Sequence, residues 1–281
     1  MIHVASLGAG LGSNPVGLDR GRTSPPIVLT FQILDDRVLA VAENTTFIAD
    51  SADPDERNAV RESFAQSVLW TGKVEERDDD GSVLVDLTSL LVSDAVGVAA
   101  RLAAAGQGSF SLDPKRSAVD TQSVLAFPDN VEAEALVTFA SKDPGPEVRS
   151  TTPVPQAVTL RMHHSFIRLP DAGFETRAAD PRMATVGLPF QNYAAPLEGS
   201  IHRRLAIRHR LEIKDGKVTD PIVFYVDRGA PEPIRSALVE GASWWAEAFE
   251  AAGFPGGYRV EVLPEGVHPL DARYNVIQWV H

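Results

Sequence analysis

The alternation of apolar and polar residues predicts β-strands over much of the first two hundred positions. Two apolar runs in "PIVLTFQILDDRVLAVAEN" flank Asp35-Asp36, which is the pattern of a β-hairpin. The segments "EAEALVTFAS" and "QAVTLRMHHSFIRLP" predict two strands that pair, joined by the proline-rich loop "KDPGPEVRSTTPVP". Further along, "IHRRLAIRHRLEIK" alternates apolar residues with basic ones and predicts a half-buried strand.

Helical spacing marks two short segments. "DPDERNAVRESFAQSVLW" opens with the Asp-Pro pair typical of a helix start, and Val60, Phe64 and Val68 recur at the four-residue interval of one helix face. "DAVGVAARLAAAG" predicts an alanine-rich helix that Gly106 closes.

The longest predicted helix is "APEPIRSALVEGASWWAEAFEAAG", with Pro233 near its start and Gly253 just past its end. Its apolar stripe consists of Ile234, Leu238, Trp245, Phe249 and Ala252. This phase predicts that Trp245 and Phe249 are buried, whereas Trp244 flanks the stripe.

The pattern of apolar and polar residues changes from Ile201 onward, and the turn "DGKVTDP" marks the predicted domain boundary. The apolar strand "IVFYVDR", the long helix and the short strands "YRVEVLP" and "YNVIQWV" follow this turn. The sequence therefore predicts an α+β protein. Residues 1–217 would form a β-rich N-terminal domain, and residues 218–281 a smaller strand–helix–strand–strand region.

Composition narrows the functional classes. The formal net charge of −12 argues against general nucleic-acid binding, because a phosphate backbone requires a basic surface. The absence of cysteine excludes disulfides, thiolate nucleophiles and cysteine-based zinc sites. No apolar run reaches the ~20 residues of a membrane span. The start "MIHVASLGAGLG" lacks the basic and apolar regions of a signal peptide.

Two motifs imitate ligand-binding loops. In "LGAGLGSNPVG", Ser13 replaces the third glycine of a phosphate-binding loop and Pro15 opposes the helix that should follow, so a turn-rich surface loop is predicted. "ERDDDG" imitates the start of a calcium-binding loop, but the twelfth position of that loop is Leu87 instead of the required glutamate. A solvated hairpin tip is predicted there.

The adjacent His163 and His164 lie on a predicted strand and therefore point to opposite faces. His164 shares its face with Leu160, Met162 and Phe166, which predicts a hydrogen-bonded core histidine, and His163 is predicted to be largely exposed. The chain contains no H-E-x-x-H and no recognisable set of three zinc ligands. We therefore assign no catalytic, cofactor-binding or metal-ligating residue, and expect the chain to bind no stoichiometric zinc.

The segment "PIVFYVDRGAPEPIRSALVEGASWWAEAFEAAGF", with "YRVEVLPEGVHPLDARYNVIQWVH" after it, resembles the opening of the catalytic domain in a family of bacterial zinc-dependent, metzincin-like metalloproteases. The segments "GLGSNPVGLDRG", "ESFAQSVLW", "LDPKRSAV", "FPDNVEAEALVTF" and "HHSFIRLP" are similar to the large N-terminal domain of unknown function in these enzymes. Metzincin domains begin with a strand, a long helix and two strands. In the family, the active-site helix with H-E-x-x-H, a third histidine and a Met-turn would follow, so the zinc ligands are expected downstream of His281.

The resemblance implies a parent enzyme that hydrolyses peptide bonds, with zinc activating water and a glutamate as general base. It also implies export to the periplasm or the extracellular space. The implied partners are the downstream catalytic domain of the same polypeptide and the peptide or protein substrate of the parent. The chain alone is predicted to be inactive. The alternative is a stand-alone binding or interaction module without enzymatic activity.

Without the active-site helix, apolar positions of the last strand are expected to lose part of their cover: Val276, Ile277, Trp279 and Val280. Uncovered apolar surface and an unpaired strand edge promote association. We therefore expect the chain to associate with itself through residues 220–281 and to be less stable than a form extended downstream.

Overall fold

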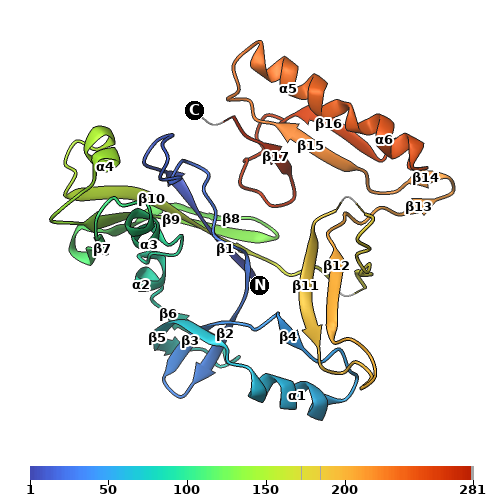
Figure 1. Ribbon diagram of the computed structural model, residues 1–281, viewed down its shortest axis with the longest axis horizontal. Coiled ribbons are helices and arrows are strands. Elements are labelled where there is room, and N and C mark those ends of the chain that lie inside the picture. Colours follow the sequence, from blue (N-terminus) through green and yellow to red (C-terminus); the bar gives the residue numbers. More distant parts are fainter. Residues whose placement is uncertain (172, 184, 280–281) are drawn as a thin grey trace. The chain divides into compact units, whose positions relative to one another are not determined.

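The computed structural model describes residues 1–171, 173–183 and 185–279 and divides into two compact units (Figure 1). Unit 1 comprises Met1–Ala126, Val131–Leu169 and Leu188–Leu205, and unit 2 comprises Phe127–Asn130, Pro170–Gly187 and Ala206–His281. Strands outweigh helices, so the predicted β-rich α+β character is confirmed.

Unit 1 contains a nine-stranded sheet in the order β6–β5–β3–β2–β1–β10–β9–β7, with β8 paired to β9. Its strands are β1 (Ile2–Ala9), β2 (Ile27–Leu34), β3 (Arg37–Ala42), β5 (Ser67–Arg77), β6 (Val83–Val85), β7 (Ser111–Leu112), β8 (Ala118–Ala126), β9 (Asn130–Ala140) and β10 (Ala157–Ile167). The predicted hairpin is present as β2 and β3, with Asp35 at a positive φ in the turn. The predicted strand pair is present as the neighbours β9 and β10. The predicted solvated tip is the exposed turn between β5 and β6.

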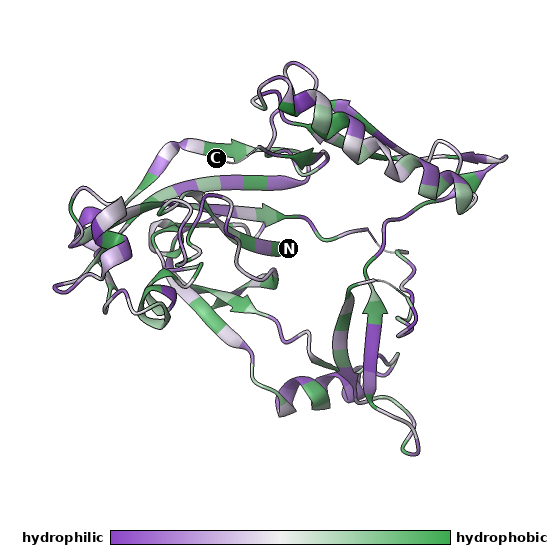
Figure 2. Cartoon of the chain, turned by 45° about the horizontal axis from the view of Figure 1, so that its top comes forward, coloured by the Kyte–Doolittle hydropathy of each residue, from purple (hydrophilic) through white to green (hydrophobic). Residues whose placement is uncertain are grey.

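The main core of unit 1 lies on one face of this sheet. Alternate residues of β10, among them Leu160 and Met162, point into it, because successive side chains of a strand face opposite sides. Figure 2 shows the alternation as green and purple bands along the long strands. Helix α3 (Val98–Ala104) covers the core through Leu102 and ends before Gly106, which has the positive φ expected of a helix-closing glycine.

Three further short helical segments belong to unit 1: α2 (Thr88–Leu91), the 3-10 helix η1 (Pro114–Arg116) and α4 (Pro146–Thr151). Helix α4 lies inside the segment that was predicted to be a proline-rich loop. Its proline occupies the first turn, where the missing N–H leaves no helical hydrogen bond unmade.

Helix α1 (Pro54–Ser63) starts where the sequence predicts, and the Asp53 side chain accepts a hydrogen bond from the backbone N–H of Asp55. The predicted helical face is wrong beyond Ser63. Phe64 is an extended C-cap residue, and Val68 lies in β5, whose pairing with β3 draws this segment into the sheet. No residue of α1 is buried.

The glycine-rich segment after β1 is a loop of turns, but its apolar side chains Leu11, Val16 and Leu18 enter the core. The prediction of a surface loop is therefore wrong for these residues. Glycine is required at position 10, because a Cβ there would lie 2.2 Å from the carbonyl oxygen of Leu18.

A three-stranded sheet in unit 1 has the order β12–β11–β4. Its edge strand β4 (Phe47–Ile48) runs parallel to β11 (Gly187–Asn192). The third strand, β12 (His202–Ala206), is only the first part of the predicted half-buried strand. That strand does not continue through residues 207–212, because the next strand residues, β13 (Ile213–Lys214), pair in a separate hairpin with β14.

Unit 2 contains a three-stranded parallel sheet in the order β16–β15–β17 (Figure 1). Its strands are β15 (Ile222–Val226), β16 (Tyr258–Val262) and β17 (Asn275–Ile277), and the hairpin of β13 with β14 (Lys217–Val218) precedes them. The predicted turn of this hairpin holds Asp215 and Gly216, both at positive φ. In β17, Val276 and Ile277 are half-buried, as is Trp279 after it; Val280 lies outside the described residues.

The predicted long helix is present as α5 (Ile234–Ser243) and α6 (Trp245–Ala251), which meet at Trp244. Gly253 follows with the expected positive φ. The helices pack on β15 and β16. The order strand, helix, strand, strand is thus present in unit 2.

The predicted phase of this helix is wrong for Trp245, which is 63% exposed, and Phe249 is only half-buried. Phe249 stacks on Tyr258 of β16 at 5.2 Å and so faces the sheet. The half-buried positions Val239, Ala242, Ala246 and Phe249 recur at helical spacing through Trp244, so the buried face is offset from the predicted stripe and Trp245 lies beside it.

Candidate functional site

A network of buried and half-buried polar side chains lies on the face of β10 opposite to the main core. His163 Nε2 is 2.6 Å from Glu132 Oε2, and its Nδ1 is 3.3 Å from Glu134 Oε1. Arg161 donates to Glu134 at 2.8 Å, and the Ser165 hydroxyl donates to Glu132 at 2.6 Å. His163 is only 6% exposed, so the prediction that it is largely exposed is wrong. Its carboxylate partners supply the hydrogen bonds that a buried imidazole requires.

Opposing effects act on the pKa of His163. Burial lowers it, while the hydrogen bond and charge of Glu132, joined by those of Glu134, raise it, and the net result is a raised pKa. The geometry favours an imidazolium held between carboxylates. Ser165 donates its proton to Glu132, so the serine–histidine contact that would activate a serine nucleophile is not made.

His164 is a hydrogen-bonded core histidine, as predicted. Its Nδ1 is 3.1 Å from Nε2 of His3, and its Nε2 is 3.0 Å from the carbonyl oxygen of Leu91. A carbonyl only accepts, so His164 Nε2 carries the proton and Nδ1 accepts from His3. Burial lowers the pKa of His164 to about 4, helped by the charge of His3. Burial also lowers the pKa of His3.

The part of the chain that the structure describes contains no cluster of metal-ligating side chains. Over residues 1–171, 173–183 and 185–279, no group of three or more histidine or carboxylate side chains is placed to hold a metal ion. In the same ranges, no helix has both the length and the apolar character that crossing a membrane requires. The expectation of no bound zinc stays a prediction.

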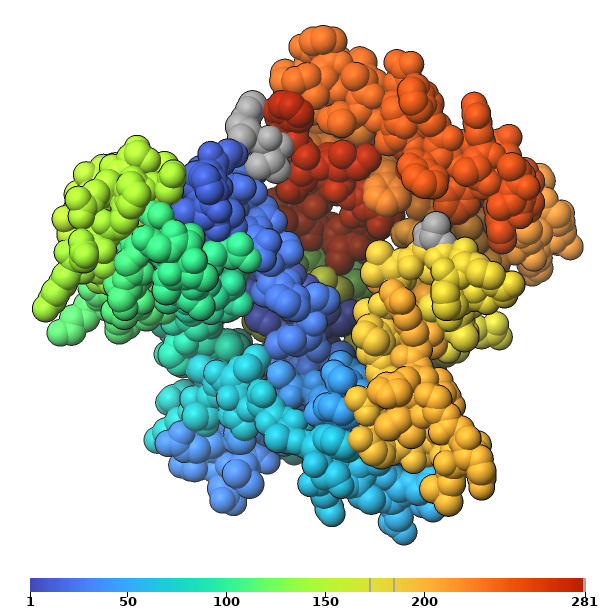
Figure 3. Space-filling model, in the orientation of Figure 1, coloured from blue at the N-terminus to red at the C-terminus, as the bar shows by residue number. Residues whose placement is uncertain are grey.

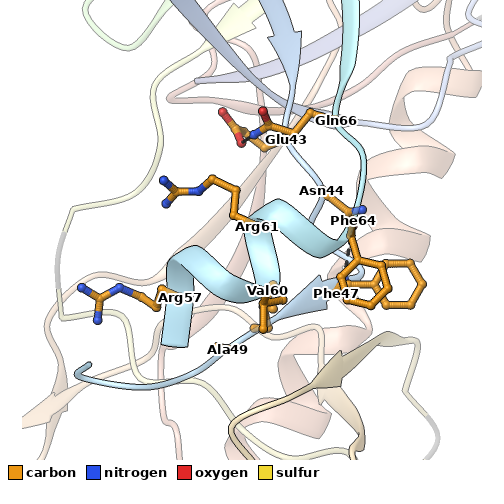
Figure 4. A pocket seen from close by; sticks show the side chains of 10 residues that line it. Glu43, Asn44, Phe47, Ala49, Arg57, Val60, Arg61, Phe64 and Gln66 are labelled. Atoms are coloured by element: carbon orange, nitrogen blue, oxygen red, sulfur yellow. Dashed lines mark hydrogen bonds between the residues drawn. The ribbon is translucent and has the colours of Figure 1, made fainter. Parts of the chain in front are cut away.

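A cavity of about 200 Å³ lies between α1 and residues 43–49, and we call it the α1 cavity (Figure 4). Phe47 and Phe64 line it and stack with their ring centroids 4.2 Å apart. Tyr193, just after β11, lies 5.1 Å from Phe64. The space-filling view shows the surfaces of α1 and of β11–β12 side by side (Figure 3). The aromatic cluster ties the helix to the three-stranded sheet.

The face of α1 that lines this cavity carries Arg57, Val60, Arg61 and Phe64, which recur at helical spacing. Arg57 donates to the carbonyl oxygen of Ser51 at 2.6 Å. Within the described residues, neither Arg57 nor Arg61 forms an ion pair with a carboxylate. Two cations therefore border a partly apolar cavity, and neither is paired with Glu43, the carboxylate that also lines it.

Glu43, Asn44 and Gln66 form the polar wall of the α1 cavity. One carboxylate oxygen of Glu43 accepts from the Thr30 hydroxyl at 2.5 Å, and the other accepts from the Gln66 amide. In Figure 4 the side chains of Glu43 and Arg61 lie on the same side of the cavity but come from different segments. The cavity thus offers cations, an apolar floor and a fixed carboxylate within the space of one small ligand.

Two wider depressions have a different character. One in unit 1, of about 760 Å³, is lined by small residues together with Arg116, Lys142 and Asp143. One in unit 2, of about 470 Å³, contains Arg259 and Arg273. These arginines already pair with Glu261 and Asp271, each at 2.6 Å. The α1 cavity differs from both in combining two cations of one helix face with stacked aromatic rings.

Trp244 and Trp245 form an exposed pair on the helices of unit 2, at 70% and 63% exposure. Large aromatic side chains on a surface are typical anchors of interfaces. The predicted stripe placed Trp245 on the buried face of the helix, so the exposed pair was not predicted from the sequence. The α1 cavity was not predicted either, although the spacing of Arg57, Val60, Arg61 and Phe64 was visible in the sequence.

Comparison with known proteins assigns a family. A search of curated proteins and a search of solved structures gave no match. A family model described as a domain of unknown function, DUF5117, matches residues 21–214, which is more than half of the chain and includes the α1 cavity. The chain therefore belongs to the DUF5117 family.

Proposed function

We propose that this chain is the N-terminal, non-catalytic portion of a zinc-dependent metalloprotease. Residues 1–217 would be its DUF5117-containing N-terminal domain, and residues 218–281 the start of a metzincin-like catalytic domain. In this proposal, the zinc ligands and the general-base glutamate lie downstream of His281. The parent enzyme would be exported and would hydrolyse peptide bonds.

The observation that carries this proposal is the order and direction of the elements in unit 2. β15, the helices α5 and α6, β16 and β17 follow one another in the order in which metzincin domains begin. β16 and β17 both run parallel to β15 and flank it. β17 is an edge strand of this sheet, so a following strand can be added without reordering it.

The exposed tryptophan pair supports a partner for unit 2. Neither α5 nor α6 contains a buried residue, although both pack on the sheet. Covering Trp244 and Trp245 by another element would add apolar burial at ~25 cal/mol for each Å² removed from water. We propose that the downstream part of the catalytic domain provides this cover.

The test compares the 281-residue chain with a version extended along its own gene. Zinc content is measured by elemental analysis after dialysis, and hydrolysis with a mixture of unstructured peptides. We expect one zinc per molecule and hydrolysis for the extended protein, and neither for the shorter chain. One tightly held zinc in the shorter chain, or an extended protein without zinc and activity, would overturn the proposal.

The second candidate function is a stand-alone binding or interaction module. The α1 cavity favours it, because a ligand site in unit 1 needs no catalytic domain. The two candidates differ in one measurement. A binding module would retain its full function without any downstream sequence, whereas the protease portion would gain zinc and activity only with it.

A further inference from the structure

We infer that the α1 cavity binds the carboxyl-terminal residue of a peptide, with its carboxylate on Arg57 and Arg61 and its apolar side chain on the aromatic floor. This inference concerns unit 1 alone. It holds whether or not the chain belongs to a protease, because every residue that forms the cavity lies between positions 43 and 66.

The charges select a carboxylate. Arg57 and Arg61 are four residues apart on α1, so their guanidinium groups border the same side of the cavity. The acidic side chains at the start of α1 do not line the cavity. Glu43 does line it, but its oxygens accept from Thr30 and Gln66 and it forms no ion pair with either arginine. In a chain of net charge −12, such a pair of cations without carboxylate partners marks a place for an anion. Guanidinium groups bind carboxylates through paired, charge-assisted hydrogen bonds.

The apolar floor selects what the carboxylate is attached to. Val60, Phe64 and Phe47 line the cavity, and the two rings are stacked at an interplanar angle of 6°. A free inorganic anion would leave this surface unused, whereas an aliphatic or aromatic side chain would cover it. The volume of about 200 Å³ is below the ~300 Å³ at which sites for drug-sized ligands begin, and suits a single residue.

The remaining wall fits a peptide better than a free amino acid. The Glu43 carboxylate lies on it, and each of its oxygens accepts only one hydrogen bond from the described residues, so it can also accept a backbone N–H. β4 is an edge strand that lines the same cavity, so an extended chain can approach alongside it. Capture of a terminal carboxylate and strand addition are both established ways of recognising peptides.

The experiment uses the full 281-residue chain and isothermal titration calorimetry. The probe is the peptide acetyl-Ala-Ala-Phe with a free carboxylate, and its C-terminal amide is the matched control ligand. We expect the acid to bind at least tenfold more tightly than the amide, because the amide is neutral and offers the arginines one acceptor oxygen instead of two. A peptide that ends in Asp keeps the carboxylate but loses the apolar contact, and we expect it to bind more weakly than the Phe peptide.

The matched variants separate this site from general charge effects. Arg57→Gln with Arg61→Gln should weaken the acid at least tenfold and leave the amide unchanged. Arg20→Gln with Arg22→Gln changes two exposed arginines elsewhere in unit 1 and should alter binding less than twofold. Val60→Phe keeps both cations, fills the cavity and should also abolish binding of the acid.

Three results would overturn the inference. The first is equal affinity for acid and amide. The second is equal weakening by the two double-arginine variants. The third is competition by inorganic phosphate with no dependence on the peptide side chain, which would make the cavity a general anion site. None of these results bears on zinc or hydrolysis, so the failure of this inference and that of the proposed function are distinguishable.

Discussion

Units 1 and 2 bury their apolar residues to very different degrees. In unit 1, one face of a long sheet, a loop and α3 enclose a continuous core that contains Phe139 and Leu160. In unit 2, the sheet contributes Ile222 and Val226 to the buried residues, but neither α5 nor α6 has a residue that is fully enclosed. Unit 1 therefore draws stability from its own core, whereas unit 2 has its backbone architecture in place and lacks apolar cover.

The largest expected effect is the loss of stability when a phenylalanine of each unit is replaced by alanine. Phe139→Ala removes a fully buried ring from unit 1 and should lower the free energy of unfolding by ~3–5 kcal/mol. Phe249→Ala removes the half-buried ring that stacks on Tyr258 in unit 2 and should cost only ~1–2 kcal/mol. Urea unfolding followed by circular dichroism measures both. Leu197→Ala, at a side chain that is 98% exposed, serves as the control. Equal costs for the two phenylalanines would contradict the difference between the units.

The next effect is the loss of stability at acidic pH that arises from a histidine in the core of unit 1. Because burial lowers the pKa of His164 from 6.5 to about 4, the unfolded chain binds its proton first as the pH falls. This group therefore removes stability between pH 6.5 and 4, by up to about 3 kcal/mol, and its contribution stays constant below that range. His163, with its raised pKa, acts in the opposite sense: its stabilisation is complete below its unfolded pKa and is lost as the pH rises through the folded value.

Urea midpoints from pH 8 to pH 4 check the sign. We expect His164→Gln to be less stable than the parent at pH 8 and to lose less stability on acidification. His202→Gln, at an exposed histidine of the same unit, should follow the parent curve. An unchanged acid dependence in His164→Gln would show that this core does not exclude the proton.

Sequence patterns located elements better than they located the surroundings of side chains. The alternation of apolar and polar residues identified β2, β3, β9 and β10. Proline marked the start of α1, and glycine the ends of α3 and α6, because helix ends depend on local sequence. The exposure of His163 was predicted incorrectly, because strand alternation tells which face a residue occupies and not what covers that face. Glu132 and Glu134, which make its burial tolerable, are distant in sequence and become neighbours only through strand pairing.

The site was less accessible to sequence reasoning than the fold. The cations of the α1 cavity were readable as a helical face, but its aromatic floor also needed Phe47 from β4, which only the fold brings against Phe64. Trp245 was misplaced because the residues that face the sheet, such as Ala246 and Phe249, define a helix face that is offset from the predicted stripe.

A smaller expected effect distinguishes two causes of the difference between the units: membership of a unit, or the burial of the individual helix. Helix α1 belongs to unit 1, yet it has no buried residue and so resembles the helices of unit 2. Asp53→Ala removes its N-cap hydrogen bond, which is worth ~1 kcal/mol. Because α1 adds little to the core, we expect faster hydrogen exchange within α1 and no change in exchange for β9 and β10. Increased exchange in β9 would mean that α1 is coupled to the core.

The smallest expected change in unfolding comes from the most conspicuous side chains. Trp244→Ser with Trp245→Ser replaces two exposed rings, so the free energy of unfolding should change by less than ~1 kcal/mol. The same substitution should nevertheless abolish self-association, because the pair is the largest exposed apolar anchor on the helices of unit 2. Light scattering over a range of concentrations measures association, and Leu197→Ser in unit 1 controls for the loss of an exposed apolar group. If the parent is monomeric at all concentrations, the tryptophans are not an association surface for this chain. If the double variant unfolds several kcal/mol more easily, the pair supports unit 2 from within, and the lack of apolar cover inferred for this unit is wrong.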